Sequence, residues 1–127
     1  MNNYKEDDIM KKILYIEDNK DTANAIKILL GNSGFDVDTA ATGKEGLKMA
    51  EQDYDLFLLD IMLPDISGWD IFEKLKKDKK NAKFAFLSAI PVSQDRMEEL
   101  KKAGVSDYII KPFKTNDLIK RIKRILE

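Results

Sequence analysis

Five residues of this 127-residue sequence carry side chains that can do chemistry, and each ends or follows a short apolar run. They are three carboxylates, a hydroxyl and an ammonium group: Glu17, Asp18, Asp60, Ser88 and Lys111. Taken singly, such residues are more often helix caps, turn formers or solvated loop residues. Their shared placement at the ends of apolar runs favours a single site.

The three carboxylates predict a site for a divalent cation. Carboxylates held close together repel one another and raise their own pKa values unless a cation is present. Oxygen ligands alone suit Mg²⁺, with Mn²⁺ as a substitute, and zinc is disfavoured because the chain has no histidine or cysteine. A carboxylate beside Mg²⁺ and a lysine is also a competent nucleophile toward a phosphoryl group. Asp60 is the best candidate, because it closes the most apolar run.

The elements that must position these residues follow a regular rhythm. Short apolar runs alternate with amphipathic stretches, which predicts five β-α units and an α/β fold with a parallel sheet. The strands are expected near 13–16, 36–40, 55–59, 83–88 and 107–110, and the helices near 20–32, 43–52, 68–78, 92–103 and 115–126. The unbroken apolar segment 56–59 is typical of a central strand. Right-handed crossovers bring the carboxyl ends of parallel strands to one edge, where ligands bind.

Composition excludes several classes of protein. With 22 basic and 23 acidic residues the net charge is −1, which lacks the basic footprint of a nucleic-acid binder. Without cysteine and histidine there are no disulfides, thiolate or imidazole metal sites, or Ser-His-Asp triads. No run approaches the roughly 20 apolar residues of a membrane span, and the N-terminus is polar, so a cytoplasmic protein without membrane contact is expected. Residues 1–10 are predicted to be a short polar leader before one domain at 11–127, and the lysine-rich segment 74–83 a solvated helix end.

Over about residues 11–126 the sequence resembles the receiver domain of two-component response regulators, the family of the stand-alone chemotaxis regulator. The resemblance rests on four segments, which read KKILYIEDN from Lys11, FLLDIMLPDISG from Phe57, FLSA from Phe86 and DYIIKPF from Asp107. It implies a doubly wound five-stranded parallel sheet in the flavodoxin-like order 2-1-3-4-5, with helices on both faces.

The resemblance also implies a role for each site residue. Asp60 would be the phosphoacceptor, and Glu17, Asp18 and Asp60 would hold Mg²⁺ together with the backbone carbonyl of Met62. Lys111 would contact a phosphoryl oxygen, and the peptide bond before the next proline would be cis.

Two further residues resemble the family's switch. Ser88 would move to hydrogen-bond the phosphoryl group, and Tyr108 would swing inward into the space released. From the residues alone, Tyr108 is instead a half-buried aromatic with its hydroxyl in water, and that arrangement is kept as one of its two states.

The implied function is a phosphorylation switch rather than an enzyme. A sensor histidine kinase, a phosphotransfer protein or a small phosphodonor would phosphorylate Asp60, with a donor histidine on another molecule because this chain has none. The change would be read by an unknown output partner on the face of the fourth helix, fifth strand and fifth helix. Asp107 and Arg121 resemble residues that form intersubunit salt bridges there in DNA-binding regulators, so homodimerisation is a hypothesis. Met62 and Ile90 are apolar where the family tunes hydrolysis, which predicts slow self-dephosphorylation.

Two other functions compete with this one. A phosphohydrolase with an aspartyl-phosphate intermediate needs a second Asp two residues after the nucleophile, and Met62 stands there. A receiver-like interaction module that is never phosphorylated is opposed by the complete set of five site residues. The sequence is compatible with a single-domain regulator and with a receiver from a longer protein.

Overall fold

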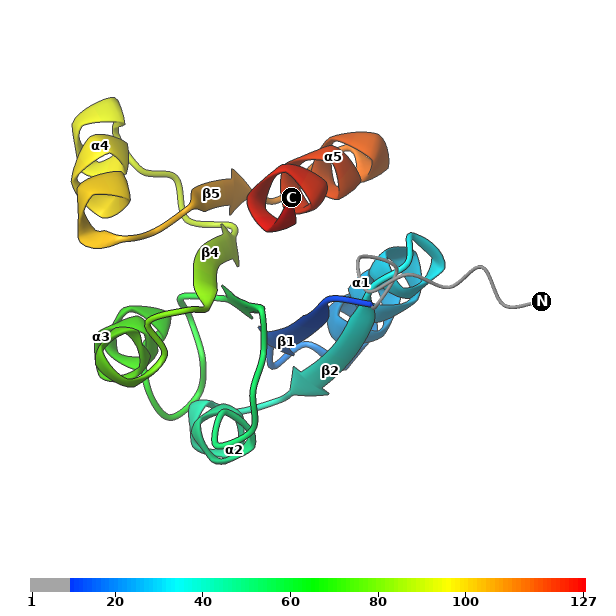
Figure 1. Cartoon of the computed structure of the whole chain (residues 1–127). Helices are drawn as coiled ribbons and strands as arrows, with labels where there is room; N and C mark the ends of the chain where they lie inside the picture. The colour runs from blue at the N-terminus through cyan, green and yellow to red at the C-terminus, as the bar shows by residue number, and fades with distance from the viewer. Residues whose placement is uncertain (1–9) are drawn as a thin grey trace.

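The computed structural model describes residues 10–127 and has a five-stranded parallel sheet at its centre (Figure 1). The strands are β1 (Lys12–Ile16), β2 (Asp36–Ala40), β3 (Leu56–Leu59), β4 (Lys83–Ser88) and β5 (Asp107–Ile110). Their order across the sheet is β2-β1-β3-β4-β5. This confirms the predicted doubly wound α/β fold with the third strand in the middle.

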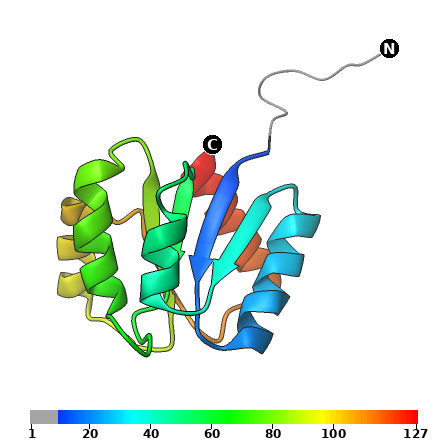
Figure 2. The ribbon, with the colours of Figure 1, turned by 90° about the horizontal axis from the view of Figure 1, so that it is seen from below.

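Five helices cover the two faces of the sheet. They are α1 (Lys20–Asn32), α2 (Gly43–Met49), α3 (Gly68–Asp78), α4 (Gln94–Ala103) and α5 (Thr115–Leu126). Helices α2, α3 and α4 pack on one face, and α1 and α5 pack on the other (Figure 1). Figure 2 shows α2 and α3 in front of the sheet and α5 behind it. Because side chains alternate along a strand, Leu14 and Ile16 of β1 enter the first of these cores, whereas Ile13 and Tyr15 enter the second.

Two helices differ in length from the sequence prediction. Helix α2 was expected to reach residue 52 but ends at Met49, because the N–H groups of Glu51 and Gln52 bond three residues back, as in a tightened last turn. Helix α4 was expected from residue 92 but begins at Gln94, because the hydroxyl of Ser93 caps it.

The N-terminal prediction is only partly covered by the structure. The polar leader predicted for residues 1–10 lies, except for the exposed Met10, outside the described residues. Between residues 10 and 127, no helix is both long enough and apolar enough to cross a membrane.

Candidate functional site

The register of β1 and β3 places the carboxylates side by side. Ile16 is paired with Leu59, so Glu17 and Asp60 are the next residues beyond the same rung of the sheet. One carboxylate oxygen from each of Glu17, Asp18 and Asp60 lies within 4.8 Å of the others. Glu17 and Asp60 are buried, whereas Asp18 is exposed. The predicted carboxylate cluster is therefore confirmed, and its all-oxygen donor set fits a hard divalent cation such as Mg²⁺.

Lys111 enters the same site from β5. Ser88 is paired with Ile110, and the backbone N–H of Lys111, one residue further on, donates to the Ser88 carbonyl at 2.8 Å. The Lys111 ammonium contacts Glu17 and lies 3.1 Å from Oδ2 of Asp60. Three carboxylates against one ammonium leave the site with a surplus of negative charge. That surplus is the electrostatic reason to expect a cation here.

Glu17 and Asp60 share one lysine, and their pKa values move apart. Burial alone would raise the pKa of Glu17, but hydrogen bonds from Lys111, the Asn19 N–H and Tyr15 bring it below the ordinary value. Burial raises the pKa of Asp60, and the nearby Glu17 charge adds to this rise while Lys111 opposes it. Glu17 is thus the better stabilised anion, and Asp60 carries more of the uncompensated charge.

A close backbone contact fixes the loop that follows Asp60. The N–H of Gly68, the first residue of α3, donates to the Ile61 carbonyl at 2.9 Å. A Cβ atom at Gly68 would stand only 2.1 Å from the carbonyl oxygen of Asp60. The N–H of Met62 donates to Oδ1 of Asp60 at 3.3 Å, which places this residue beside the carboxylate. That the backbone carbonyl of Met62 binds the metal stays a prediction.

Comparison with known proteins decides the family. The family model of the response regulator receiver domain matches residues 13–123. This chain is a response regulator receiver domain. Receiver domains are signalling domains of two-component systems rather than enzymes with an independent substrate, which argues against the phosphohydrolase alternative.

Known relatives of this receiver domain include a transcriptional regulatory protein and a response regulator. The transcriptional regulatory protein CusR of Escherichia coli K12 is 39% identical over 116 residues, which cover 91% of this chain and 51% of CusR. The response regulator SaeR of Staphylococcus epidermidis is 35% identical over 117 residues, covering 92% of this chain and 51% of SaeR. The chain thus spans about half the length of these relatives.

Solved structures of similar proteins have the same fold. TrrA from Thermotoga maritima, in complex with Mg²⁺ and beryllofluoride, matches with a TM-score of 0.79 and 33% identity over 92% of this chain and 100% of that one. The non-phosphorylated HemR receiver domain from Leptospira biflexa matches with a TM-score of 0.84 and 30% identity over 92% of this chain and 94% of that one.

The two predicted switch residues of this receiver domain lie on neighbouring strands. Ser88 is buried at the end of β4, where its Oγ accepts the N–H of Ile90 at 3.3 Å. Tyr108 on β5 is only 1% exposed and donates its hydroxyl to the Ile90 carbonyl. Its ring packs 6.3 Å from that of Trp69 and 6.0 Å from that of Phe86. Tyr108 is therefore buried in this structure and not half-buried with its hydroxyl in water, and its inward movement into space released by Ser88 stays a prediction.

The predicted cis peptide is present between Lys111 and Pro112. Placement of the five candidate residues at the carboxyl edge is also confirmed. Their individual roles in phosphorylation remain predictions. The Ser88 hydroxyl bonds to backbone in this structure, and its link to Lys111 runs through its own carbonyl.

Sequence reasoning missed Tyr15 and Asp65. Tyr15 lies within the apolar run predicted as a strand at 13–16, yet its hydroxyl donates to Oε1 of Glu17 at 2.9 Å, and burial raises its pKa, so it stays a donor. Asp65 accepts the N–H groups of Gly43 and Lys44 at 2.8 Å each, and these bonds at the start of α2 lower its pKa. A tyrosine two residues before the acidic pair was a signal for the first, whereas no local pattern links Asp65 to α2.

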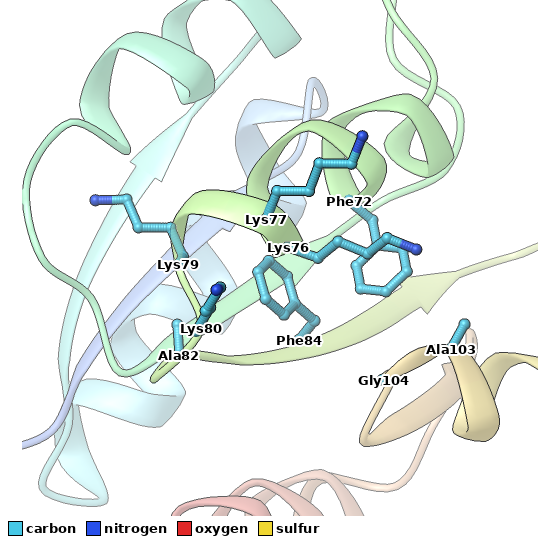
Figure 3. A pocket seen from close by; sticks show the side chains of 9 residues that line it. All are labelled: Phe72, Lys76, Lys77, Lys79, Lys80, Ala82, Phe84, Ala103 and Gly104. Atoms are coloured by element: carbon cyan, nitrogen blue, oxygen red, sulfur yellow. The ribbon is translucent and has the colours of Figure 1, made fainter.

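The lysine-rich segment 74–83 borders a hollow of about 360 Å³ at the opposite edge of the sheet (Figure 3). The Lys76 ammonium lies 3.1 Å from Glu73 and 5.3 Å from the centre of the Phe72 ring, and Lys79 donates to the Gln52 carbonyl at 3.2 Å. Lys79 extends away from Lys76 in Figure 3, so the two ammonium groups do not converge on one anion. This supports the predicted solvated helix end.

Proposed function

We propose that this receiver domain is a phosphorylation switch whose phosphoacceptor is Asp60. The observation that carries the proposal is the position of the Asp60 carboxylate, which lies within 4.8 Å of Glu17 and Asp18 and 3.1 Å from the Lys111 ammonium. The surplus of negative charge at the site calls for a divalent cation, and a buried carboxylate beside such a cation and a lysine is a competent nucleophile toward phosphorus. TrrA, solved with Mg²⁺ and beryllofluoride, supports the same ion for this site.

In the proposed step, a carboxylate oxygen of Asp60 forms a bond to the phosphorus of the donor. The bond from phosphorus to the donor's nitrogen or oxygen breaks, and the leaving group departs with that electron pair. A histidine nitrogen takes up a proton from solvent, whereas acetate leaves as the anion. Glu17, Asp18, Asp60 and the Met62 carbonyl would hold Mg²⁺, which supplies neutralisation of the phosphoryl oxygens' charge when bound. Lys111, whose ammonium already lies against Asp60, would bring a positive charge to those oxygens.

The donor is proposed to be a sensor histidine kinase, a phosphotransfer protein or a small phosphodonor. These donors act inside the cell, so we place the domain in the cytoplasm. The phosphoryl group would attract the Ser88 hydroxyl, which in the structure accepts the N–H of Ile90. The Tyr108 hydroxyl donates to the carbonyl of the same Ile90, so a movement of Ser88 would affect Tyr108 through Ile90. The change would thereby reach the face formed by α4, β5 and α5, where an output partner or a second copy is proposed to dock.

A homodimer through this face would involve a rearrangement of an existing ion pair. Nε of Arg121 on α5 lies 3.4 Å from Asp107 at the start of β5 within the same chain, and 3.8 Å from Asp117. Exchange of these partners between two copies would give an intersubunit bridge. Light scattering of the phosphorylated domain at high concentration tests this, and a particle that stays monomeric would exclude it.

The direct test is intact-mass spectrometry after incubation with acetyl phosphate and Mg²⁺. We expect the mass of one phosphoryl group to be added, and we expect EDTA to prevent it because the carboxylates then lose their cation. A folded protein that gains no phosphoryl group from acetyl phosphate, and none from histidine kinases, would instead be the unphosphorylated interaction module.

The phosphorylated state is expected to be long-lived, because the side chains of Met62 and Ile90 offer no group that orients or activates water. Met62 is 68% exposed, so an asparagine there is tolerated and meets solvent beside Asp60. We expect Met62→Asn and Ile90→Glu each to lose the phosphoryl group about tenfold faster than the wild type. This increase in rate is smaller than the one that a well-positioned general base gives. The decay is followed by intact mass after the donor is removed.

The matched control for these variants is Ile28→Glu, which changes another exposed apolar residue on α1, 63% exposed. It should decay at the wild-type rate. Equal lifetimes for all four proteins would show that apolar residues at 62 and 90 do not set the rate of hydrolysis.

A further inference from the structure

We propose that Tyr15 is a positioning residue for the cation site, acting through the carboxylate of Glu17. The inference rests on the proposed function, because it gives Tyr15 a task in the same site. In the structure the Tyr15 hydroxyl bonds to Glu17 and not to Asp60.

The geometry of β1 makes this contact possible. Residues two apart on a strand point to the same face of the sheet, so Tyr15 and Glu17 lie one above the other. Tyr15 is fully buried, and its ring lies in the core under α1 and α5. Its hydroxyl donates to Oε1 of Glu17 at 2.9 Å, and the Glu17 side chain is itself buried.

The core does not need this hydroxyl. The ring packs in an apolar cluster that includes Ile13, Leu58 and Ile109, and phenylalanine would fill the same volume. A buried hydroxyl is costly unless it is hydrogen-bonded, so a tyrosine in this core is tolerated because Glu17 accepts its hydrogen bond. The Tyr15 hydroxyl therefore does not serve packing, and what it contributes is its hydrogen bond to the Glu17 carboxylate.

Tyr15 matters most when Lys111 changes partners. In the structure Oε1 of Glu17 accepts hydrogen bonds from both Tyr15 and Lys111, and Lys111 also bonds to Asp60. If Lys111 moves toward a phosphoryl group, Oε1 of Glu17 keeps the Tyr15 donor and Oε2 keeps the Asn19 N–H at 3.1 Å. The carboxylate then stays oriented toward its acidic neighbours. Without the hydroxyl, Glu17 is free to turn or to retain Lys111.

The test is direct measurement of Mn²⁺ binding, from the electron paramagnetic resonance signal of the free ion, in the wild type and in Tyr15→Phe. We expect Tyr15→Phe to weaken Mn²⁺ binding about tenfold, as loss of a partner that orients a metal ligand typically does. Tyr54→Phe is the matched control, since it removes a second buried hydroxyl that donates to a carboxylate, that of Asp38 at 2.8 Å. It should leave Mn²⁺ affinity unchanged.

A double-mutant cycle with Glu17→Gln shows whether Tyr15 acts through Glu17. If it does, adding Tyr15→Phe to Glu17→Gln weakens binding less than about twofold, because the effects of coupled residues do not add. If Tyr15→Phe fails to fold, the cause would be the buried Glu17 carboxylate that has lost a donor. The double variant has no charge at residue 17, so comparing its Mn²⁺ affinity with that of Glu17→Gln still tests the inference. Wild-type affinity in Tyr15→Phe, or an equal loss with and without Glu17, would overturn the inference. The proposed function is judged separately, by phosphoryl uptake of the wild type.

Discussion

Asp60→Asn should abolish phosphoryl uptake from acetyl phosphate, leaving the intact mass unchanged under conditions in which the wild type gains one group. The amide that replaces the carboxylate has no anionic oxygen to attack phosphorus, and it removes one of the three negative charges proposed to hold the cation. Because phosphoryl uptake requires both the attacking oxygen and the bound cation, we expect a complete loss rather than a slower reaction.

The same substitution should leave the fold intact or more stable when no divalent cation is present. The pKa of Asp60 is raised by burial and by the nearby Glu17 charge, so the ionised form is less favourable in the folded state than in the unfolded one. That cost is present above the folded pKa and fades as the pH falls through it. A neutral asparagine avoids the cost at neutral pH, so the melting temperature should be equal or higher in EDTA.

A matched control separates the loss of the nucleophile from the loss of a charge. Asp55→Asn makes the same change just before the other end of β3, where the carboxylate accepts the Lys12 N–H at 2.8 Å. It should be phosphorylated like the wild type. Uptake that persists in Asp60→Asn, and maps by peptide mass to Glu17 or Asp18, would move the phosphoacceptor to that residue.

The strands and the site residues that follow them could be predicted because they depend on short-range patterns. The apolar run that ends at Leu59 must be covered on both faces, and Asp60 is the first charged residue after it. Parallel strands then bring such ends together whatever the helices do in detail. The four segments that resemble the receiver family added the strand order and the roles.

What could not be predicted depends on contacts between distant segments. The carboxylate of Asp65 bonds to Gly43 and Lys44, more than twenty residues earlier, and no pattern near Asp65 specifies that pairing. To predict the bond from Tyr15 to Glu17, one would have to know that both side chains are buried and that the hydroxyl reaches the carboxylate. In both cases a polar group finds its hydrogen-bond partner only when the chain is folded.

The approach of α3 to Asp60 is a third contact of this kind, and Gly68→Ala should disrupt it. The added Cβ would stand 2.1 Å from the carbonyl oxygen and 2.9 Å from the carbonyl carbon of Asp60, and 3.0 Å from Cα of Ile61. These are backbone atoms, so no flexible side chain can move aside, and either α3 or the Asp60 backbone must shift. We expect a loss of about 1–3 kcal/mol in the free energy of unfolding, the usual cost of overpacking.

A shift of the Asp60 backbone should also slow phosphorylation, by about 10- to 100-fold, because small misplacements of a reacting group are costly. Gly31→Ala is the matched control: its Cβ would meet nothing within 4 Å, and on α1 the alanine should stabilise the helix by about 0.5–1 kcal/mol. Denaturant unfolding and the rate of phosphoryl uptake are measured for both variants. If Gly68→Ala matches the wild type in both, the contact between α3 and Asp60 does not constrain the phosphoacceptor, and the loop has room that the structure does not show.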